Sequence, residues 1–200
     1  MLKAATSAFA RRGYQDASMD EIAALCEITK PMLYAYFDSK EGLFLACLDE
    51  GDKRLRTAVR DAVEGVTGAE QALWRGLIAL FRFFEEDRDM WALGYRSGAG
   101  APSFSLAAAR SREAMGELLR DVFVTTAVGA GVDPDVLKRE SEPLAHALIG
   151  AAVALVSWAC ERRHEPSELQ ALRLMNFAWM GLGSLVRGEL WIPPTEEESQ

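Results

Sequence analysis

The sequence predicts an all-α fold, with a small N-terminal domain of three helices joined to a larger helical C-terminal domain. Along most of the 200 residues, apolar side chains recur at intervals of three and four, which is the spacing of one buried helix face. Hydrophobic residues make up 50% of the chain, enough for a substantial core. No stretch alternates apolar and polar residues as a half-buried strand does, and no internal repeat is evident.

The first two predicted helices lie within the N-terminal domain, residues 1–48. Leu2 and Phe9 are seven residues apart and mark one face of a first helix that is expected to end near Gly13. The buried face of the second helix carries four residues at the spacing i, i+3, i+4 and i+7: Met19, Ile22, Ala23 and Cys26.

Capping residues predict where the next helices begin. Ser18 and Glu21 have the spacing of a capping box, in which each side chain bonds the other residue's backbone amide, so a helix is expected to start there. Thr29 suits the N-cap of a third helix, because Pro31 is tolerated in a first turn, where its missing amide has no helical partner. Residues 38–39 both suit the cap of a long fourth helix.

The C-terminal domain, residues 49–200, is predicted to be helical throughout. Its helices are separated by polar or glycine-containing breaks at residues 65–68, 98–102, 129–131 and 162–166. A new helical turn is expected at Asp133-Pro134. The last two helices, at about residues 142–162 and 167–187, are the most apolar of the chain.

The charge balance restricts how this chain can bind nucleic acid. It carries 22 basic and 30 acidic residues, a formal net charge of -8, and the first 50 residues hold 5 basic against 8 acidic ones. A domain-wide basic surface is therefore absent. Any DNA contact must come from a few placed groups, with the acidic side chains turned away from the phosphates.

The cysteines and the N-terminus predict a reduced, cytoplasmic setting. The three cysteines are odd in number, lie far apart and include no Cys-x-x-Cys pair, which argues against a disulfide framework or a zinc site. No cofactor is expected. The first residues, MLKAATSAFARR, lack a long apolar core and do not have the pattern of a signal peptide.

The block from Ser18 to Lys40 has the outline of a helix-turn-helix, whose second helix enters the DNA major groove. Lys40 stands at a helix start, where the macrodipole disfavours a cation unless a phosphate is also bound there. Tyr34 and Tyr36 flank inward residues, and their hydroxyls are suitable donors to phosphate oxygens. An ordinary helical hairpin within a bundle is the alternative on spacing alone.

The ordered elements of this region resemble the DNA-binding domain of the TetR (tetracycline repressor) family. They are Phe9-Ala10, Gly13-Tyr14, Ile22-Ala23, Thr29 to Phe37, and Ser39 to Leu43. The resemblance covers about 45 residues, and the rest of the chain matches only in its helical layout. It implies a homodimeric transcriptional regulator, usually a repressor that a small molecule releases from DNA.

The resemblance also implies which residues contact DNA. Carried over by position, these are Ser18, Thr29, Lys30, Pro31, Met32, Tyr34, Tyr36 and Lys40. Lys30 could contact a guanine and Met32 a thymine methyl group, so direct base readout is sparse and DNA shape is expected to add specificity. The operator is expected to be an inverted repeat that matches a twofold dimer.

Several positions depart from the family pattern. Glu27 stands where the family often has a turn glycine, which adds backbone strain or a negative charge near the groove. Tyr36 replaces a frequent histidine, while Met32 and Ala35 remove possible polar contacts. The family's basic N-terminal arm does not precede Leu2, which predicts weak DNA binding or a chain that starts further upstream.

The segment Pro143–Cys160 is the most apolar run of the chain. A membrane span needs about 20 such residues, so length alone leaves that alternative open. Its alanines and glycines, and a similarly apolar partner at Leu172–Val186, favour two buried helices that form a four-helix bundle with a second subunit. The expected interface residues are Leu148, Ala152, Leu155, Ala159, Met175, Trp179 and Leu182.

Aromatic residues of the central helices predict an apolar effector pocket, given the family resemblance. The residues expected to line it are Trp74, Phe81, Phe84, Trp91, Tyr95, Phe104 and Phe123, and a plain aromatic core is the alternative for each. Arg82, Arg96 or His146 could supply a polar anchor.

Catalysis has little support, because the two histidines, His146 and His164, are eighteen residues apart and fit no metal-binding spacing. A helical small-molecule-binding protein or enzyme without DNA-binding activity and a membrane-associated bundle remain as alternatives. The preferred interpretation is a ligand-responsive DNA-binding regulator. It would act as a homodimer, would be released by a small apolar or amphipathic effector, and would need no membrane.

Overall fold

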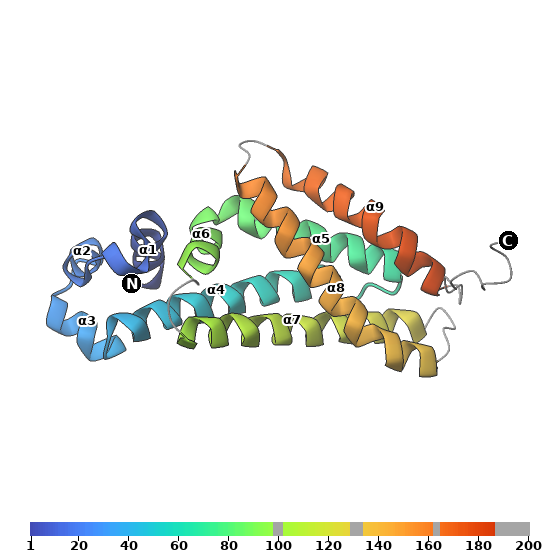
Figure 1. The fold of residues 1–200 in the computed structure, drawn as a ribbon, viewed down its shortest axis with the longest axis horizontal. Helices are drawn as coiled ribbons and strands as arrows, with labels where there is room; N and C mark the ends of the chain where they lie inside the picture. The colour runs from blue at the N-terminus through green and yellow to red at the C-terminus, as the bar shows by residue number, and fades with distance from the viewer. Residues whose placement is uncertain (98–101, 129–133, 162–164, 187–200) are drawn as a thin grey trace, which may run out of the picture.

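The predicted all-α architecture is confirmed. The computed structural model describes residues 1–97, 102–128, 134–161 and 165–186, and these residues form helices joined by short connections (Figure 1). The helices are α1 (Leu2–Asp16), α2 (Met19–Leu25), α3 (Lys30–Phe37), α4 (Lys40–Val63), α5 (Ala69–Glu86), α6 (Arg88–Ser97), α7 (Pro102–Val128), α8 (Pro134–Glu161) and α9 (Ser167–Val186).

The molecule is elongated, with a small head at one end and a larger helical body at the other. Helices α1, α2 and α3 form the head together with the first turns of α4 (Figure 1). Helix α4 then continues into the body, where α7 runs beside it in the same direction and α5 packs against it (Figure 1). Helix α8 packs on α7, and α9 packs on α5. Helix α6 lies against α1 and so links the two parts.

Side-chain caps begin the three helices that follow α1, as the sequence predicted. The Ser18 hydroxyl accepts a hydrogen bond from the Asp20 amide at 3.2 Å, and the Thr29 hydroxyl accepts one from the Met32 amide at 3.4 Å. Ser39 caps α4 by accepting from the Gly42 amide at 2.9 Å.

One detail of the head differs from prediction. The reciprocal half of the capping box is absent, because the Glu21 carboxylate pairs with the Arg12 guanidinium at 2.8 Å, and an ion pair offers it a stronger partner than an amide. The expected break at Gly13 is present, because this residue adopts a non-helical φ of 78° and ψ of 167°. A second short helical segment then continues α1 to Asp16 across this kink.

Helix α4 is continuous across the expected domain boundary at residues 48–49. Its first half buries Leu43, Phe44 and Cys47 in the core of the head, whereas Val59 is buried in the body. Burial raises the pKa of the Cys47 thiol to about 11, and all three cysteines are free. The two expected domains therefore share one rigid element.

Phe104 of α7 joins the body to the head. It is 2% exposed, and its ring centroid lies 4.8 Å from that of Tyr14 and 4.4 Å from that of Phe44. Edge-to-face and tilted aromatic contacts of this kind stabilise a pair by about 0.5–1.5 kcal/mol beyond area burial. Phe104 was expected to line an effector pocket; it lies in the core of the head, outside the apolar pocket of the body, and also borders a cavity between α4, α6 and α7.

Helix α8 is one element from Pro134 to Glu161, where the sequence predicted a separate turn before a helix that starts near residue 142. It passes through Pro143, whose exposed position lets water reach the carbonyl that the missing amide leaves unpaired. Residues Lys138–Cys160 are long and apolar enough to cross a membrane, judged by length and composition only. In the bundle, the inner face of this segment packs on α5 and α9 in a shared core.

The tight turn between α3 and α4 predicts that an alanine at Gly42 lowers the stability of the protein, whereas an alanine at an uncrowded glycine does not. An alanine Cβ at Gly42 would lie 2.3 Å from the backbone oxygen of Phe37, so the turn must shift. We expect Gly42→Ala to lower the free energy of unfolding by roughly 1–3 kcal/mol. The measurement is thermal unfolding followed by circular dichroism.

Gly94→Ala is the matched control. A Cβ at this helical glycine meets no atom within 4 Å, so we expect stability to rise by about 0.5–1 kcal/mol, because alanine restricts the unfolded chain more than glycine does. Equal melting temperatures for the two variants would contradict the close approach at Gly42.

Candidate nucleic-acid interface and ligand pocket

The outer face of α3 is unusually apolar for a solvent-exposed surface. Leu33 faces inward and is fully buried, which turns its neighbours outward. Met32 is 46% exposed, Tyr34 38% and Tyr36 62%. Ser18, Thr29, Lys30 and Pro31 are exposed on the same α2–α3 region. Clustered exposed apolar side chains commonly mark an interaction surface.

Lys30 is held by an acidic partner that the sequence did not reveal. Its Nζ lies 2.8 Å from Oδ2 of Asp20 on α2, and this hydrogen bond raises the pKa of the Lys30 ammonium. Both side chains are exposed, so the pair is weak and readily exchanged. A DNA phosphate or base that approaches Lys30 therefore competes with Asp20.

Lys40 has a structural partner in the position where a phosphate contact was expected. Its ammonium donates a hydrogen bond to the backbone oxygen of Gln15 at 2.8 Å and lies 5.0 Å from the centroid of the Tyr14 ring. Partial burial lowers the pKa of Lys40, and burial together with the nearby Glu41 carboxylate raises the pKa of Tyr14. Lys40 therefore ties the start of α4 to the end of α1.

The turn between α2 and α3 contains the unusual backbone that the sequence suggested at Glu27. This residue has a φ of 55°, in the left-handed region that glycine adopts without steric cost. The strain lies at the connection that sets the angle between the two helices, and the side chain is exposed.

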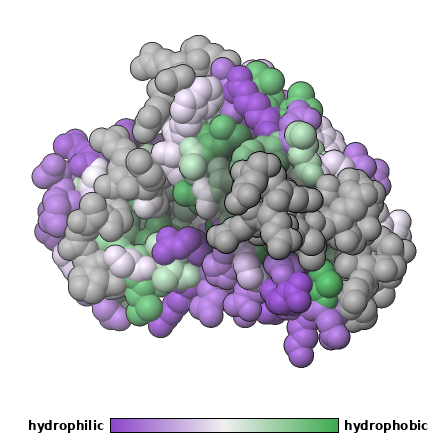
Figure 2. All heavy atoms as spheres, turned by 45° about the vertical axis from the view of Figure 1, so that its right-hand side comes forward, coloured by the Kyte–Doolittle hydropathy of each residue, from purple (hydrophilic) through white to green (hydrophobic). Residues whose placement is uncertain are grey.

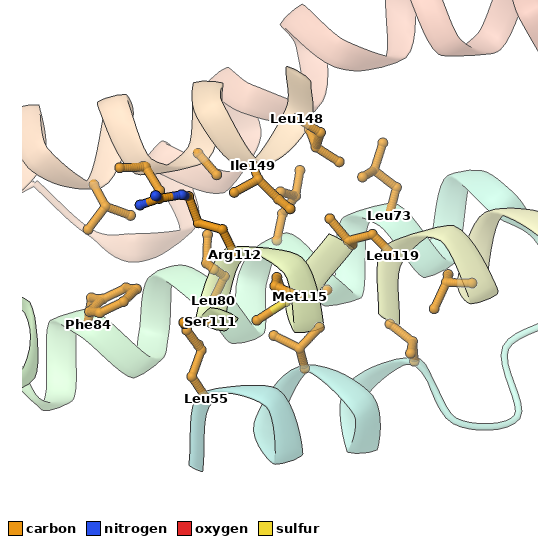
Figure 3. A pocket seen from close by; sticks show the side chains of 18 of the residues that line it. Leu55, Leu73, Leu80, Phe84, Ser111, Arg112, Met115, Leu119, Leu148 and Ile149 are labelled. Carbon is orange, nitrogen blue, oxygen red and sulfur yellow. The ribbon is translucent and has the colours of Figure 1, made fainter. Parts of the chain in front are cut away.

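The body encloses an apolar pocket between α4, α5, α7 and α8, with a volume of about 180 Å³. Phe84, Trp91 and Phe123, three of the seven expected aromatics, line it. Most of the remaining wall is aliphatic, from residues such as Leu77 and Met115. Figure 3 shows Ser111 and Arg112 toward the end near Phe84, and Leu73 and Leu119 toward the other end.

The other expected aromatics occupy different places. Phe81 is buried in the core shared by α5, α8 and α9, and Trp74 packs against the same core. Tyr95 lies outside the residues whose side chains the structure describes. Sequence reasoning misplaced Phe81 and Trp74, because helical spacing identifies buried faces and cannot tell a cavity wall from a filled core.

Two of the expected polar anchors, Arg82 and His146, do not line the apolar pocket. Arg82 pairs with Glu168 at 2.7 Å, and Nδ1 of His146 lies 3.0 Å from the backbone oxygen of Glu142. Arg96 lies outside the residues whose side chains are described. The charged side chain on the pocket wall is Arg112, which the sequence reasoning missed. The signal available was an arginine one turn before Met115, on the same helix face as apolar residues.

The face formed by α8 and α9 differs in detail from the expected interface. Leu148, Ala152 and Met175 are buried within the protomer, Leu155, Ala159 and Trp179 are half-buried, and the side chain of Leu182 lies outside the described residues. The exposed large apolar residues described on α9 are instead Leu169 at 38%, Leu172 at 48%, Phe177 at 72% and Met180 at 81%. Hydrophobic surface, green in Figure 2, lies along the upper edge of the molecule, at the height where α9 begins.

Comparison with known proteins agrees with this architecture. The family model for bacterial regulatory proteins of the tetR family matches residues 1–47. The HTH-type transcriptional activator FasR of Mycolicibacterium smegmatis is 31% identical over 190 residues, which cover 91% of this chain and 81% of that protein.

Solved structures show the same fold over nearly the whole chain. A TetR-like transcriptional regulator from Rhodococcus is 33% identical, with a TM-score of 0.70 over 91% of this chain and 93% of that one. The regulator FadR from Bacillus subtilis, in complex with stearoyl-CoA, has a TM-score of 0.76 over 88% of this chain and 95% of that one. At 12% identity, this second likeness supports the fold alone.

The positive φ at Glu27 predicts that glycine stabilises the head. We expect Glu27→Gly to raise the free energy of unfolding by about 1 kcal/mol, because it removes the clash of Cβ in the left-handed conformation. Glu27→Ala removes the same charge but keeps the Cβ, so it serves as the control in urea unfolding. Equal stabilisation by both variants would assign the effect to charge and not to backbone strain.

Proposed function

This chain belongs to the TetR family of bacterial transcriptional regulators, and from that premise we propose how its own residues act. It is a helix-turn-helix regulator of transcription, since its relatives are DNA-binding regulators and not enzymes. The proposed function is ligand-responsive binding to an inverted-repeat operator by a homodimer in the cytoplasm. The observation that carries the proposal is the outward face of α3.

We infer that α3 lies in the major groove with Met32, Tyr34 and Tyr36 toward the DNA. Met32 is suited to a thymine methyl group and the tyrosine hydroxyls to phosphates. Lys30 would exchange Asp20 for a guanine or a phosphate. Ser18, Thr29 and Pro31 would contact the backbone or base edges nearby, and Lys40 would act mainly by holding α4 in place.

The apolar pocket supports an effector site in the body, residues 49–200, separate from the reading head, residues 1–48. Its wall includes residues of α4, which also forms the core of the head, so occupancy can bias the position of the head. The Bacillus subtilis neighbour carries stearoyl-CoA, so the fold is compatible with a ligand that has a long apolar chain.

We propose repression relieved by the ligand, which is the usual behaviour that the family resemblance implies. Activation is the second candidate, because the Mycolicibacterium smegmatis relative is named as an activator. The two differ in sign: a ligand lowers operator affinity in the first case and raises it in the second.

We propose that α9 and the adjoining part of α8 form the dimer interface. Phe177 and Met180 are large apolar side chains left in solvent by the single chain. A second copy that packs its own α8 and α9 against them would build a four-helix bundle and bury this surface. The expected interface residues that are buried within the protomer would then pack α8 and α9 against the rest of the body.

DNA binding is tested by selecting duplexes from a random library with the wild-type protein. We expect an inverted repeat, and we expect Lys30→Ala with Tyr34→Ala to weaken binding to it by about 5- to 100-fold, from the loss of one base contact and one phosphate contact. Binding is measured by fluorescence anisotropy at fixed salt.

Lys53→Ala is the control, since Lys53 is exposed on the body segment of α4 and its loss changes the net charge without touching α3. Unchanged affinity of the folded double variant would defeat the proposed mode of DNA binding.

The interface is tested by replacing Phe177 and Met180 together with glutamate. We expect the variant to elute as a monomer in size-exclusion chromatography with light scattering, because four buried charges per dimer would face each other. Val124→Glu is the control, since Val124 is an exposed apolar residue on α7. A dimer that persists in the double variant would place the interface elsewhere.

A further inference from the structure

Two further cavities adjoin the apolar pocket toward the head. One has a volume of about 250 Å³, and the other, of about 560 Å³, lies between α4, α6 and α7 and is termed the junction cavity. All three share Ser111, Arg112 and Val153 on their walls. They therefore adjoin one another in a space that runs along α4 from the body toward the head.

The chemistry of the walls changes along this space. At the far end the wall is made by Val63, Gly76 and Phe123, with no charged side chain. At the junction cavity it includes two acidic residues, Asp49 and Asp52, and three arginines, Arg56, Arg110 and Arg112, so the basic side chains are in excess. A ligand that fills both parts needs an apolar chain at one end and a polar group at the other.

The charges at the junction show which polar group fits. The Ser111 hydroxyl donates to one oxygen of Asp52, and Nε of Arg56 donates to the other oxygen at 2.9 Å, so both oxygens of this carboxylate are satisfied. In the part of the chain that the structure describes, Arg112 has no hydrogen-bond or ion-pair partner. A guanidinium presents its donors as a planar fork that matches a carboxylate or a phosphate.

The side chain of Arg112 stands where it could hold such a group. Figure 3 shows it reaching from α7 toward α8 across the Phe84 end of the pocket. The residue is exposed, so it can meet an acid that enters from solvent. Arg56 already neutralises Asp52, which reduces the repulsion that an incoming acid would meet there.

We propose that the ligand of this regulator is a linear amphipathic acid, bound with its acidic group at Arg112 and its chain directed toward Gly76. The proposal rests on the effector site assigned above and adds to it the ligand class, its direction and the residues that select it. Arg112 selects the acid, and Gly76 sets the length of chain that fits.

Gly76 is placed to limit the chain because it leaves the far wall without a side chain. A Cβ built there would lie 3.5 Å from Cγ1 of Val63 and 3.9 Å from Cγ1 of Val59, which is ordinary contact. Leu55 and Val63, on the same face of α4, are about 12 Å apart at the helical rise per residue. The apolar part of the space therefore suits an extended chain, and a larger side chain at position 76 would shorten it.

The acidic end would lie beside the residues that hold the head. The walls of the junction cavity include Phe44 of α4 and Phe104 of α7, which pack against each other in the core of the head. Charge and volume added at Arg112 therefore act on the same cavity that this contact borders. A ligand bound at this location would therefore be able to change the orientation of α3.

The ligand class is tested by isothermal titration calorimetry with three probes of equal chain length: dodecanoate, dodecyl phosphate and dodecanol, each below the concentration at which it aggregates. We expect both acids to bind at least about tenfold more tightly than the alcohol, because a hydrogen bond to a charged group is stronger than one to a neutral group. The ratio of the two acids then distinguishes a carboxylate from a phosphate ligand.

We expect Arg112→Gln to abolish the preference for acid over alcohol, and Arg75→Gln, at an exposed arginine on the outer face of α5, to leave it intact. Equal binding of acid and alcohol by the wild-type protein, a preference that survives in Arg112→Gln, or no binding of either acid would overturn the proposal.

Chain-length selection is tested with Gly76→Leu and the milder Gly76→Ala. We expect Gly76→Leu to weaken dodecanoate while octanoate binding is kept, with Gly76→Ala in between. Equal loss of both acids in a variant with the wild-type melting temperature would overturn the role of Gly76. These titrations need no DNA, so their failure is distinct from a failure to select an operator.

Discussion

The continuity of α4 is the constraint on which the rest of the molecule depends. The same helix buries Phe44 in the head and Val59 in the body. Because one rigid helix belongs to both cores, the position of the head relative to the body depends on α4. Phe104 strengthens the link, because it brings α7 into the core of the head. Protein cores repack between discrete arrangements more readily than they deform. A change along α4 is therefore expected to reach α3 as movement of the whole head.

The head achieves DNA binding with little spare positive charge. Three of its five basic residues, Arg12, Lys30 and Lys40, already have partners within the protein. Binding to any DNA backbone then requires partner exchange, so the sequence-independent electrostatic term is expected to be small. In the proposed mode of DNA binding, the exposed apolar and tyrosine side chains of α3 supply more of the affinity. Such a protein gains selectivity, because poorly matched DNA offers it little attraction.

The sequence predicted the fold well and the pocket only in part, for physical reasons. Helical periodicity and capping residues are local signals, so the helices and the caps at Ser18, Thr29 and Ser39 followed from neighbouring residues. The Lys30–Asp20 pair and the position of Phe104 depend on how separate helices meet, which periodicity does not encode. Helix α8 continues through Pro143 because that position is exposed and water can reach the unpaired carbonyl, which the local sequence does not reveal. Arg112 was missed because it carries charge on an otherwise apolar helix face, and its significance emerges only beside a cavity.

The three cysteines differ in burial, so one of them can be labelled selectively for spectroscopy. Cys47 is buried and its raised pKa keeps it protonated at neutral pH, and burial also raises the pKa of Cys160. Cys26 is the C-cap of α2, in the turn that leads to α3, and is partly exposed to solvent. A thiol-reactive label would therefore favour Cys26 in the native chain. In a dimer, two such labels would report the separation of the reading heads by dipolar or energy-transfer measurements, without any cysteine being added or removed.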